Sequence, residues 1–156
     1  MDELDHDRAI APEPPTGEAG WCRDKQAIRF PLGLPGFPGA TRFTLERAGR
    51  WPERLLVMRS LEDPGIRFLM LPCAGATLPL DRAELEAACS RHGLDVAQVA
   101  VLLVVSLQPG EESAAVSGLC ANRRAPVLLD TSRALGVQHV LDNPGYAVRW
   151  PLAHAA

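Results

Sequence analysis

Lysine and aromatic residues are scarce in this sequence, and its net charge is small. Lys25 is the single lysine, and the 156 residues include four Phe, three Trp and one Tyr. The formal charge of −3 at pH 7 argues against a protein that holds nucleic acid mainly by neutralising phosphates. The few rings argue against a single-strand binder, which needs exposed aromatic side chains beside positive charge.

The sequence also lacks a long apolar run and a basic start. Its longest uncharged stretch runs from Val96 to Gly110 and contains the polar residues Gln98 and Ser106. A membrane-spanning helix needs about 20 predominantly apolar residues. The first residues are acidic, whereas a secretion signal has a basic region followed by an apolar core. We therefore expect a cytoplasmic protein without a membrane partner.

Motifs for catalysis and metal binding are missing as well. The sequence has no Gly-x-Ser-x-Gly elbow, no His-x-x-x-His pair and no acidic cluster with metal-loop spacing. We predict a binding protein that is not an enzyme and uses no cofactor. Reduced cytoplasmic thiols are expected because the four cysteines lie far apart without a Cys-x-x-Cys motif: Cys22, Cys73, Cys89 and Cys120.

Residues 1–20 differ in composition from the rest of the chain. They hold six acidic residues against Arg8, a net charge of −5, while the other 136 residues carry a net charge of +2. Proline and glycine are frequent and large apolar residues nearly absent, so this segment cannot bury enough surface to offset its ordering entropy. We predict a disordered acidic tail, the alternative being an acidic arm for a basic partner, and one domain at 21–156.

Short apolar runs separated by Gly and Pro dominate the rest of the chain. One helix is expected from about 82 to 92, capped by Asp81 with Glu84 in a capping box and ended by Gly93. This pattern predicts an all-β, mainly antiparallel single domain, either a sandwich or a barrel, with one short helix. The predicted strands are 27–30, 42–46, 55–61, 66–71, 99–107, 114–119, 126–129, 137–141 and 146–150.

Residues 30–39 contain three glycines, which invite a phosphate-loop interpretation. Proline has no N–H to cradle a phosphate, and no Gly-Lys-Ser/Thr follows. We instead predict a rigid crossing that places Phe30, Leu34 and Phe37 in the core. Four residues are expected to have architectural roles: Gly33, Pro35, Gly36 and Pro126.

Three further residue groups have a structural and a functional interpretation. Cys89 and His92 share a helix face, where a small hydrophobe and a helix-end histidine are favoured over a metal site. His139 is favoured as a half-buried strand histidine over a catalytic base. Arg123 and Arg124 are favoured as exposed loop residues over an RNA-binding group.

Four motifs occur in order along the chain. They are I-R-F-P-L-G-L-P-G-F at 28–37, L-V-M-R-S-L-E-D-P at 56–64, N-R-R-A-P-V at 122–127, and Q-H-V-L at 138–141 followed by Y-A-V-R-W-P-L at 146–152. Together they resemble the flagellar assembly factor FliW family over roughly residues 26–152. Arg59 stands where this family commonly has Gln, and Arg123 where it usually has an apolar residue.

The resemblance implies a function and partners. A FliW-like protein would be a non-enzymatic, chaperone-like regulator with a small β-barrel fold, monomeric when free. It would bind flagellin and, in exchange, the RNA-binding translational repressor CsrA, so that free flagellin sets flagellin translation. It would not bind nucleic acid directly. Two alternatives remain: an enzymatic or small-ligand barrel that uses a residue such as His139, and direct RNA binding through Arg123 and Arg124.

Six polar or protruding residues are candidates for partner contacts. Leu61, Glu62 and Asp63 lie at a predicted hairpin turn, where the acids would complement basic CsrA. The later motifs supply Asn122, Arg124 and Gln138. Their structural alternatives are that Asn122 caps a turn, Arg124 holds a carboxylate and Gln138 satisfies an edge backbone group.

Overall fold

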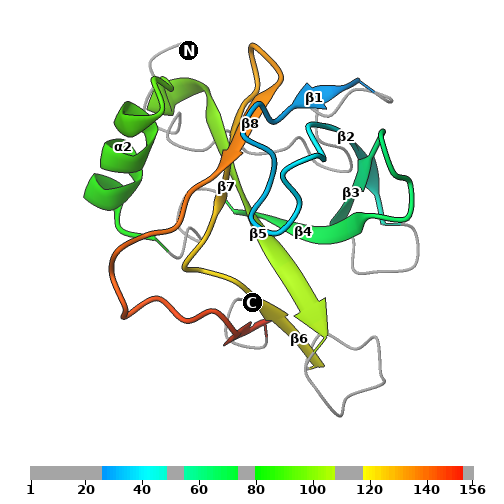
Figure 1. Cartoon of the computed structure of the whole chain (residues 1–156). Helices are drawn as coiled ribbons and strands as arrows, with labels where there is room; N and C mark the ends of the chain where they lie inside the picture. Colours follow the sequence, from blue (N-terminus) through cyan, green and yellow to red (C-terminus); the bar gives the residue numbers. More distant parts are fainter. Residues whose placement is uncertain (1–25, 49–54, 74–79, 108–117, 153–156) are drawn as a thin grey trace, which may run out of the picture.

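The computed structural model describes residues 26–48, 55–73, 80–107 and 118–152 (Figure 1). Within these ranges the chain forms short strands, one α-helix and one 3₁₀ turn. The elements are β1 (Ile28–Arg29), β2 (Arg42–Arg47), β3 (Leu56–Ser60), β4 (Arg67–Cys73), α2 (Arg82–Arg91), η2 (Val96–Gln98), β5 (Val99–Leu107), β6 (Leu119–Ala121), β7 (Val127–Asp130), β8 (Leu135–Gln138) and β9 (Trp150–Pro151).

Seven of the described strands close a barrel in the order β4-β3-β2-β1-β8-β7-β5, and β5 pairs back with β4. The neighbours are antiparallel except β1 and β8, which pair in parallel at Arg29 and Leu135. The end of β5 leaves the barrel to pair with β6, and β9 pairs with β6. The predicted fold class, a mainly antiparallel barrel with one short helix, is confirmed.

Strand alternation gives the molecule two apolar cores. On β5, Ala100 and Leu102 face the barrel interior, which is filled by side chains such as Phe43 and Met58. The alternate residues Val101 and Leu103 face outward and are buried in a second core with α2. Because β5 is covered on both faces, its sequence is an unbroken apolar run, and the predicted strand 99–107 matches the observed bounds.

Helix α2 packs its buried side onto the outside of the barrel. The carboxylate of Asp81 accepts a hydrogen bond from the Glu84 N–H at 3.3 Å, as predicted. The capping box is not reciprocal, because the Asp81 N–H donates to the Tyr146 hydroxyl at 2.8 Å. Gly93 follows the helix with φ +68°, as expected. Cys89 is buried among the apolar residues that α2 packs onto the barrel, and burial first, then Asp95 and Glu86, raise the pKa of its thiol to about 11.

The glycines of the 30–39 segment allow its tight turns. Gly33 and Gly36 adopt positive φ, and a Cβ on Gly33 would lie 2.7 Å from the Pro38 backbone. Phe30 and Leu34 are buried as predicted. The prediction for Phe37 is wrong: this residue is 39% exposed, and its ring lies edge-on to Phe68, which itself packs against the core.

Three strand predictions need correction or fall outside the description. Most of 114–119 lies outside the described residues, and β6 begins at Leu119. The strand predicted at 137–141 spans Leu135–Gln138. The strand predicted at 146–150 is reduced to Trp150–Pro151, because the residues before it form turns. The predicted acidic tail at 1–20 and Cys22 also lie outside the described residues.

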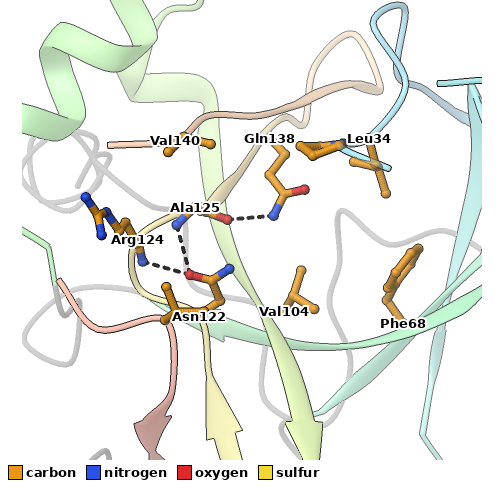
Figure 2. Close-up of a pocket in the computed structure, with 10 residues that line it drawn as sticks. Leu34, Phe68, Val104, Asn122, Arg124, Ala125, Gln138 and Val140 are labelled. Carbon is orange, nitrogen blue, oxygen red and sulfur yellow. Dashed lines mark hydrogen bonds between the residues drawn. The ribbon is translucent and has the colours of Figure 1, made fainter. Parts of the chain in front are cut away.

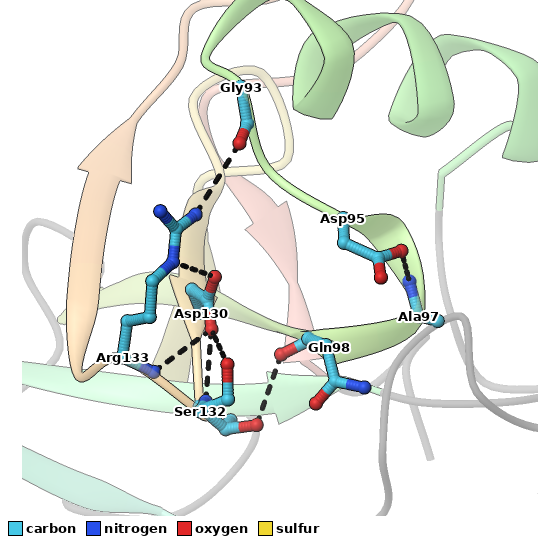
Figure 3. Close-up of polar contacts among 8 residues, drawn as sticks. Gly93, Asp95, Ala97, Gln98, Asp130, Ser132 and Arg133 are labelled. Carbon is cyan, nitrogen blue, oxygen red and sulfur yellow. Dashed lines mark hydrogen bonds and ion pairs between the residues drawn. The ribbon is translucent and has the colours of Figure 1, made fainter.

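The β7–β8 turn is held by a buried carboxylate, Asp130 (Figure 3). Asp130 accepts hydrogen bonds from the Ser132 N–H and hydroxyl and from the Arg133 N–H and guanidinium, at 2.7–3.1 Å. Burial raises the pKa of Asp130, but these hydrogen bonds outweigh it and hold the pKa below its usual value. Arg133 also donates to the Gly93 carbonyl, which ties the turn to the end of α2.

Candidate functional site

One end of the barrel is open and apolar. We call this hollow the mouth groove; it has a volume of about 410 Å³. Phe68 on β4 and Val104 on β5 face the barrel interior and are only partly buried, because the groove reaches them from outside. Val140 and Val148 form part of its wall and are more than half exposed. An apolar hollow at a barrel mouth is a common place for a ligand or a partner segment to bind.

The predicted residues Asn122, Arg124 and Gln138 all line the mouth groove (Figure 2). The Asn122 side-chain oxygen accepts hydrogen bonds from the Arg124 and Ala125 N–H groups at 3.0 and 3.1 Å. The Gln138 amide donates to the Ala125 carbonyl at 2.9 Å. The turn-capping role of Asn122 and the backbone-satisfying role of Gln138 are therefore confirmed, and both shape the groove wall.

Arg124 does not hold a carboxylate in the described part of the chain. In Figure 2 its guanidinium points away from the side of the groove formed by Leu34 and Phe68. Arg124 therefore places a positive charge at one edge of a mainly apolar groove.

The predicted residues Leu61, Glu62 and Asp63 lie elsewhere, in the turn between β3 and β4. Leu61 is 43% exposed. Glu62 accepts hydrogen bonds from the Thr41 hydroxyl at 2.9 Å and from the N–H and guanidinium of Arg42 at 3.2 and 3.4 Å. Partial burial raises the pKa of Glu62, but the hydrogen bonds outweigh it and lower the pKa to about 2. Glu62 is thus an ionised group already paired within the chain.

A histidine pair that the sequence does not reveal joins α2 to the barrel. His92 Nε2 lies 3.0 Å from His139 Nδ1, and the two rings meet edge-on. Burial first, then the positive charge of His92 and of Arg91, lower the pKa of His139, and Asp142 opposes them. His139 is half-buried as predicted, but it follows the end of β8 at Gln138 and is therefore not a strand residue. It does not line the mouth groove. Because 47 residues separate the pair, no local spacing indicates it.

Arg123 has a structural role that the sequence interpretation missed. Its guanidinium lies 5.1 Å from the centre of the Tyr146 ring and 4.7 Å from that of Trp150. Its N–H donates to the Ala147 carbonyl at 3.0 Å. Arg123 therefore fastens the C-terminal segment to the barrel and is not a solvent-facing RNA contact. In the sequence, the aromatic residues Tyr146 and Trp150 of the last motif are the feature that could have indicated this contact.

The described residues show neither a metal cluster nor a spanning helix. Among them, no three His, Cys, Asp or Glu side chains are grouped so as to hold a metal ion. No helix in the described ranges is long and apolar enough to cross a membrane.

Comparison with known proteins gives a consistent set of similarities. A family model described as FliW protein matches residues 17–152. The flagellar assembly factor FliW of Azoarcus sp. (strain BH72) is 27% identical over 134 residues, which cover 85% of this chain and 92% of that protein. The flagellar assembly factor FliW of Symbiobacterium thermophilum is 30% identical over 133 residues, covering 83% and 91%.

A solved structure supports the fold independently. A crystal structure of the flagellar assembly factor FliW aligns with a TM-score of 0.59 and 21% identity, covering 83% of this chain and 87% of that one. At this identity the likeness establishes the barrel fold.

Proposed function

The chain belongs to the FliW family, and we propose that it is a flagellar assembly factor that binds flagellin and CsrA in exchange. FliW proteins are non-enzymatic, so the function of this chain rests on its binding surfaces. By exchanging the two partners, the protein couples the amount of free flagellin to flagellin translation. It acts in the cytoplasm as a monomer when free, with residues 21–156 as the working domain.

The mouth groove is the surface that we assign to flagellin. Flagellin's terminal segments are amphipathic, and such segments place an apolar face into an apolar groove. The groove offers Phe68 and Val104 at its base and the exposed Val140 and Val148 at its wall. Asn122 and Gln138 hold the wall in place through backbone hydrogen bonds, so the groove is formed before a partner binds.

The β3–β4 turn is the surface we assign to CsrA. Leu61 and Asp63 are exposed at its tip, and CsrA, an RNA-binding protein, presents basic surface. Glu62 is paired with Arg42, whereas the Asp63 carboxylate accepts a hydrogen bond from the Gly65 N–H at 3.1 Å and forms no ion pair with a described residue. Asp63 therefore supplies the acidic charge of this turn that is available to a partner. Flagellin and CsrA would then bind at different residues. Each would exclude the other by a steric clash or by a change transmitted through the barrel.

Calorimetric titration with monomeric flagellin tests the proposal. Val140→Asp places a charge in the apolar groove and is expected to weaken flagellin binding at least about tenfold. This corresponds to a loss of roughly 1.4 kcal/mol in the free energy of binding. Leu32→Asp is the matched control, because Leu32 is 72% exposed and does not line the mouth groove.

The same titration with CsrA, with and without flagellin, tests the exchange. Flagellin should weaken CsrA binding, and Asp63→Asn should weaken CsrA binding without affecting that of flagellin. Failure of both partners to bind the unmodified protein at micromolar concentration would disprove the function. Equal binding of flagellin by the Val140 and Leu32 variants would disprove the site.

A further inference from the structure

Four arginines share one outer face of the barrel. Strand register places Arg29 on β1 beside Arg42 on β2, and Arg59 on β3 beside Arg67 on β4. Thr44, two residues after Arg42, lies opposite Arg59, so the two pairs are diagonal neighbours on one surface. We call these four residues the arginine face. In Figure 1, β1, β2 and β3 lie on the side of the barrel away from α2.

The arginine face has more positive charge than its acidic neighbours neutralise. Arg42 pairs with Glu62 at 3.4 Å and Arg59 with Glu46 at 3.5 Å. Arg29 and Arg67 are exposed and form no ion pair with the described residues. Arg59 and Arg67 lie directly opposite each other, and Glu46 neutralises one of these two like charges, so a net positive charge remains there to attract a further anion.

We propose that the acidic segment 1–20 of this chain binds the arginine face. This segment carries a net charge of −5, while the rest of the chain carries +2. It is tethered next to its target, because the chain enters β1 at Ile28 and Arg29 is the following residue. The face is three strand spacings wide, roughly 14 Å, and the few residues between segment and strand span that distance when extended.

The tether and the charges together determine how the contact behaves. Because the segment and the arginine face belong to one chain and are only a few residues apart in sequence, the effective concentration is on the order of mM, which is enough to populate a weak electrostatic contact. The contact is carried by exposed charges, so salt screens it. The acidic segment covers the arginine face in the manner of an intramolecular competitor, and other polyanions reach these arginines only by displacing it.

The test compares the full chain with a full-length variant whose tail acids are replaced by amides, D2N, E3Q, D5N, D7N, E13Q and E18Q. Backbone amide resonances of the two proteins are recorded at low salt, about 20 mM, and at about 0.5 M. The expected result is a shift difference at the four arginines at low salt that disappears at high salt, with the amides of α2 unchanged. Shift differences confined to other surfaces, or insensitive to salt, overturn the proposal.

Charge removal on the barrel gives an independent measurement. Arg29→Gln and Arg67→Gln are introduced together, once with the acidic tail and once with the neutralised tail. The low-salt shift difference between these two proteins should be much smaller than in the barrel with all four arginines. The control is Arg91→Gln, an exposed arginine on α2, which should leave that effect intact. If the shift difference fell equally in the Arg29/Arg67 variant and in the Arg91 variant, the tail would respond only to the net charge of the barrel, and the proposal would fail.

Addition of poly(U) RNA identifies a competing occupant. We expect RNA to shift the resonances of the arginine face more strongly in the tail-neutralised variant than in the unmodified protein. Equal shifts in both would mean that the face is open to polyanions, which contradicts coverage by the tail.

Discussion

Single buried positions decide whether the barrel interior can close. Gly136 on β8 lies against Phe30, whose ring packs edge-on to Phe43 at 5.2 Å. A Cβ at Gly136 would lie 2.5 Å from the Phe30 ring, closer than carbon atoms approach. The glycine is therefore required by its neighbour rather than by a turn, since its φ is not positive.

Gly136→Ala is expected to destabilise the protein by about 1–3 kcal/mol, because Phe30 cannot move without disturbing a filled core. Urea unfolding measures the loss. Gly39→Ala is the control, since a Cβ there meets no atom within 4 Å, and its change should stay within about 0.5 kcal/mol. Equal stability of the two variants would contradict the assigned packing of β8 on Phe30.

At the scale of elements, the C-terminal segment depends on contacts with the barrel rather than on its own strand. β9 is two residues long, so its two ladder pairs with β6 supply little. Arg123 adds the stacking on Tyr146 and Trp150 and a backbone hydrogen bond to Ala147. These contacts place Val148 at the mouth groove.

Arg123→Lys should loosen this segment although it keeps the charge, because an ammonium lacks the planar guanidinium that stacks on both rings. We expect a loss of about 0.5–2 kcal/mol in the free energy of unfolding. Flagellin binding should weaken as well, through the displaced Val148. Arg149→Lys, a change at an exposed arginine in the same segment, is expected to have no effect. A neutral result for Arg123→Lys would show that β9 holds the segment without the stack.

At the scale of the whole molecule, α2 is attached to the barrel through an apolar interface and a few polar contacts. The His92–His139 contact and the hydrogen bond from Arg133 to Gly93 both lie at the C-terminal end of the helix. At the other end, Tyr146 contacts Asp81 and Glu84. The helix thus links the β7–β8 hairpin to the C-terminal segment, and these two parts also form walls of the mouth groove.

The histidine pair predicts a pH dependence of stability. Burial, His92 and Arg91 hold the pKa of His139 below its usual value, so the folded state favours the neutral ring. The unfolded chain takes up a proton near pH 6.5, and stability is therefore full above that pH and falls as the pH drops below it. His139→Asn should flatten this dependence between pH 8 and about 5. The depressed pKa values of Glu62 and Asp130 affect stability only at lower pH, below their unfolded values.

Urea unfolding across this pH range measures the dependence. His92→Asn is a second variant, which should reduce the slope by removing the neighbouring charge while leaving burial of His139. A slope unchanged in both variants would exclude the pair as its source.

The local features of this protein follow from the sequence alone. Alternation and turn residues indicate an antiparallel sandwich or barrel, and the four motifs that resemble the FliW family favour the barrel. The capping residues locate α2, and the apolar run of β5 indicates a strand covered on both faces. The turn-forming glycines were predicted correctly because a positive φ is a local requirement. Asn122, Arg124 and Gln138 were singled out by their motifs, and these residues do meet at one groove.

Only the tertiary structure decided which distant residues meet. It separated Leu61, Glu62 and Asp63 from the mouth groove, because the β3–β4 turn projects from another part of the barrel. It placed Phe37 at the surface, brought His92 to His139, and stacked Arg123 on two rings instead of exposing it. It also set the four arginines side by side through the register of β1 to β4. Sequence patterns report the faces of one element, whereas contacts between elements depend on register and barrel closure, which no local pattern encodes.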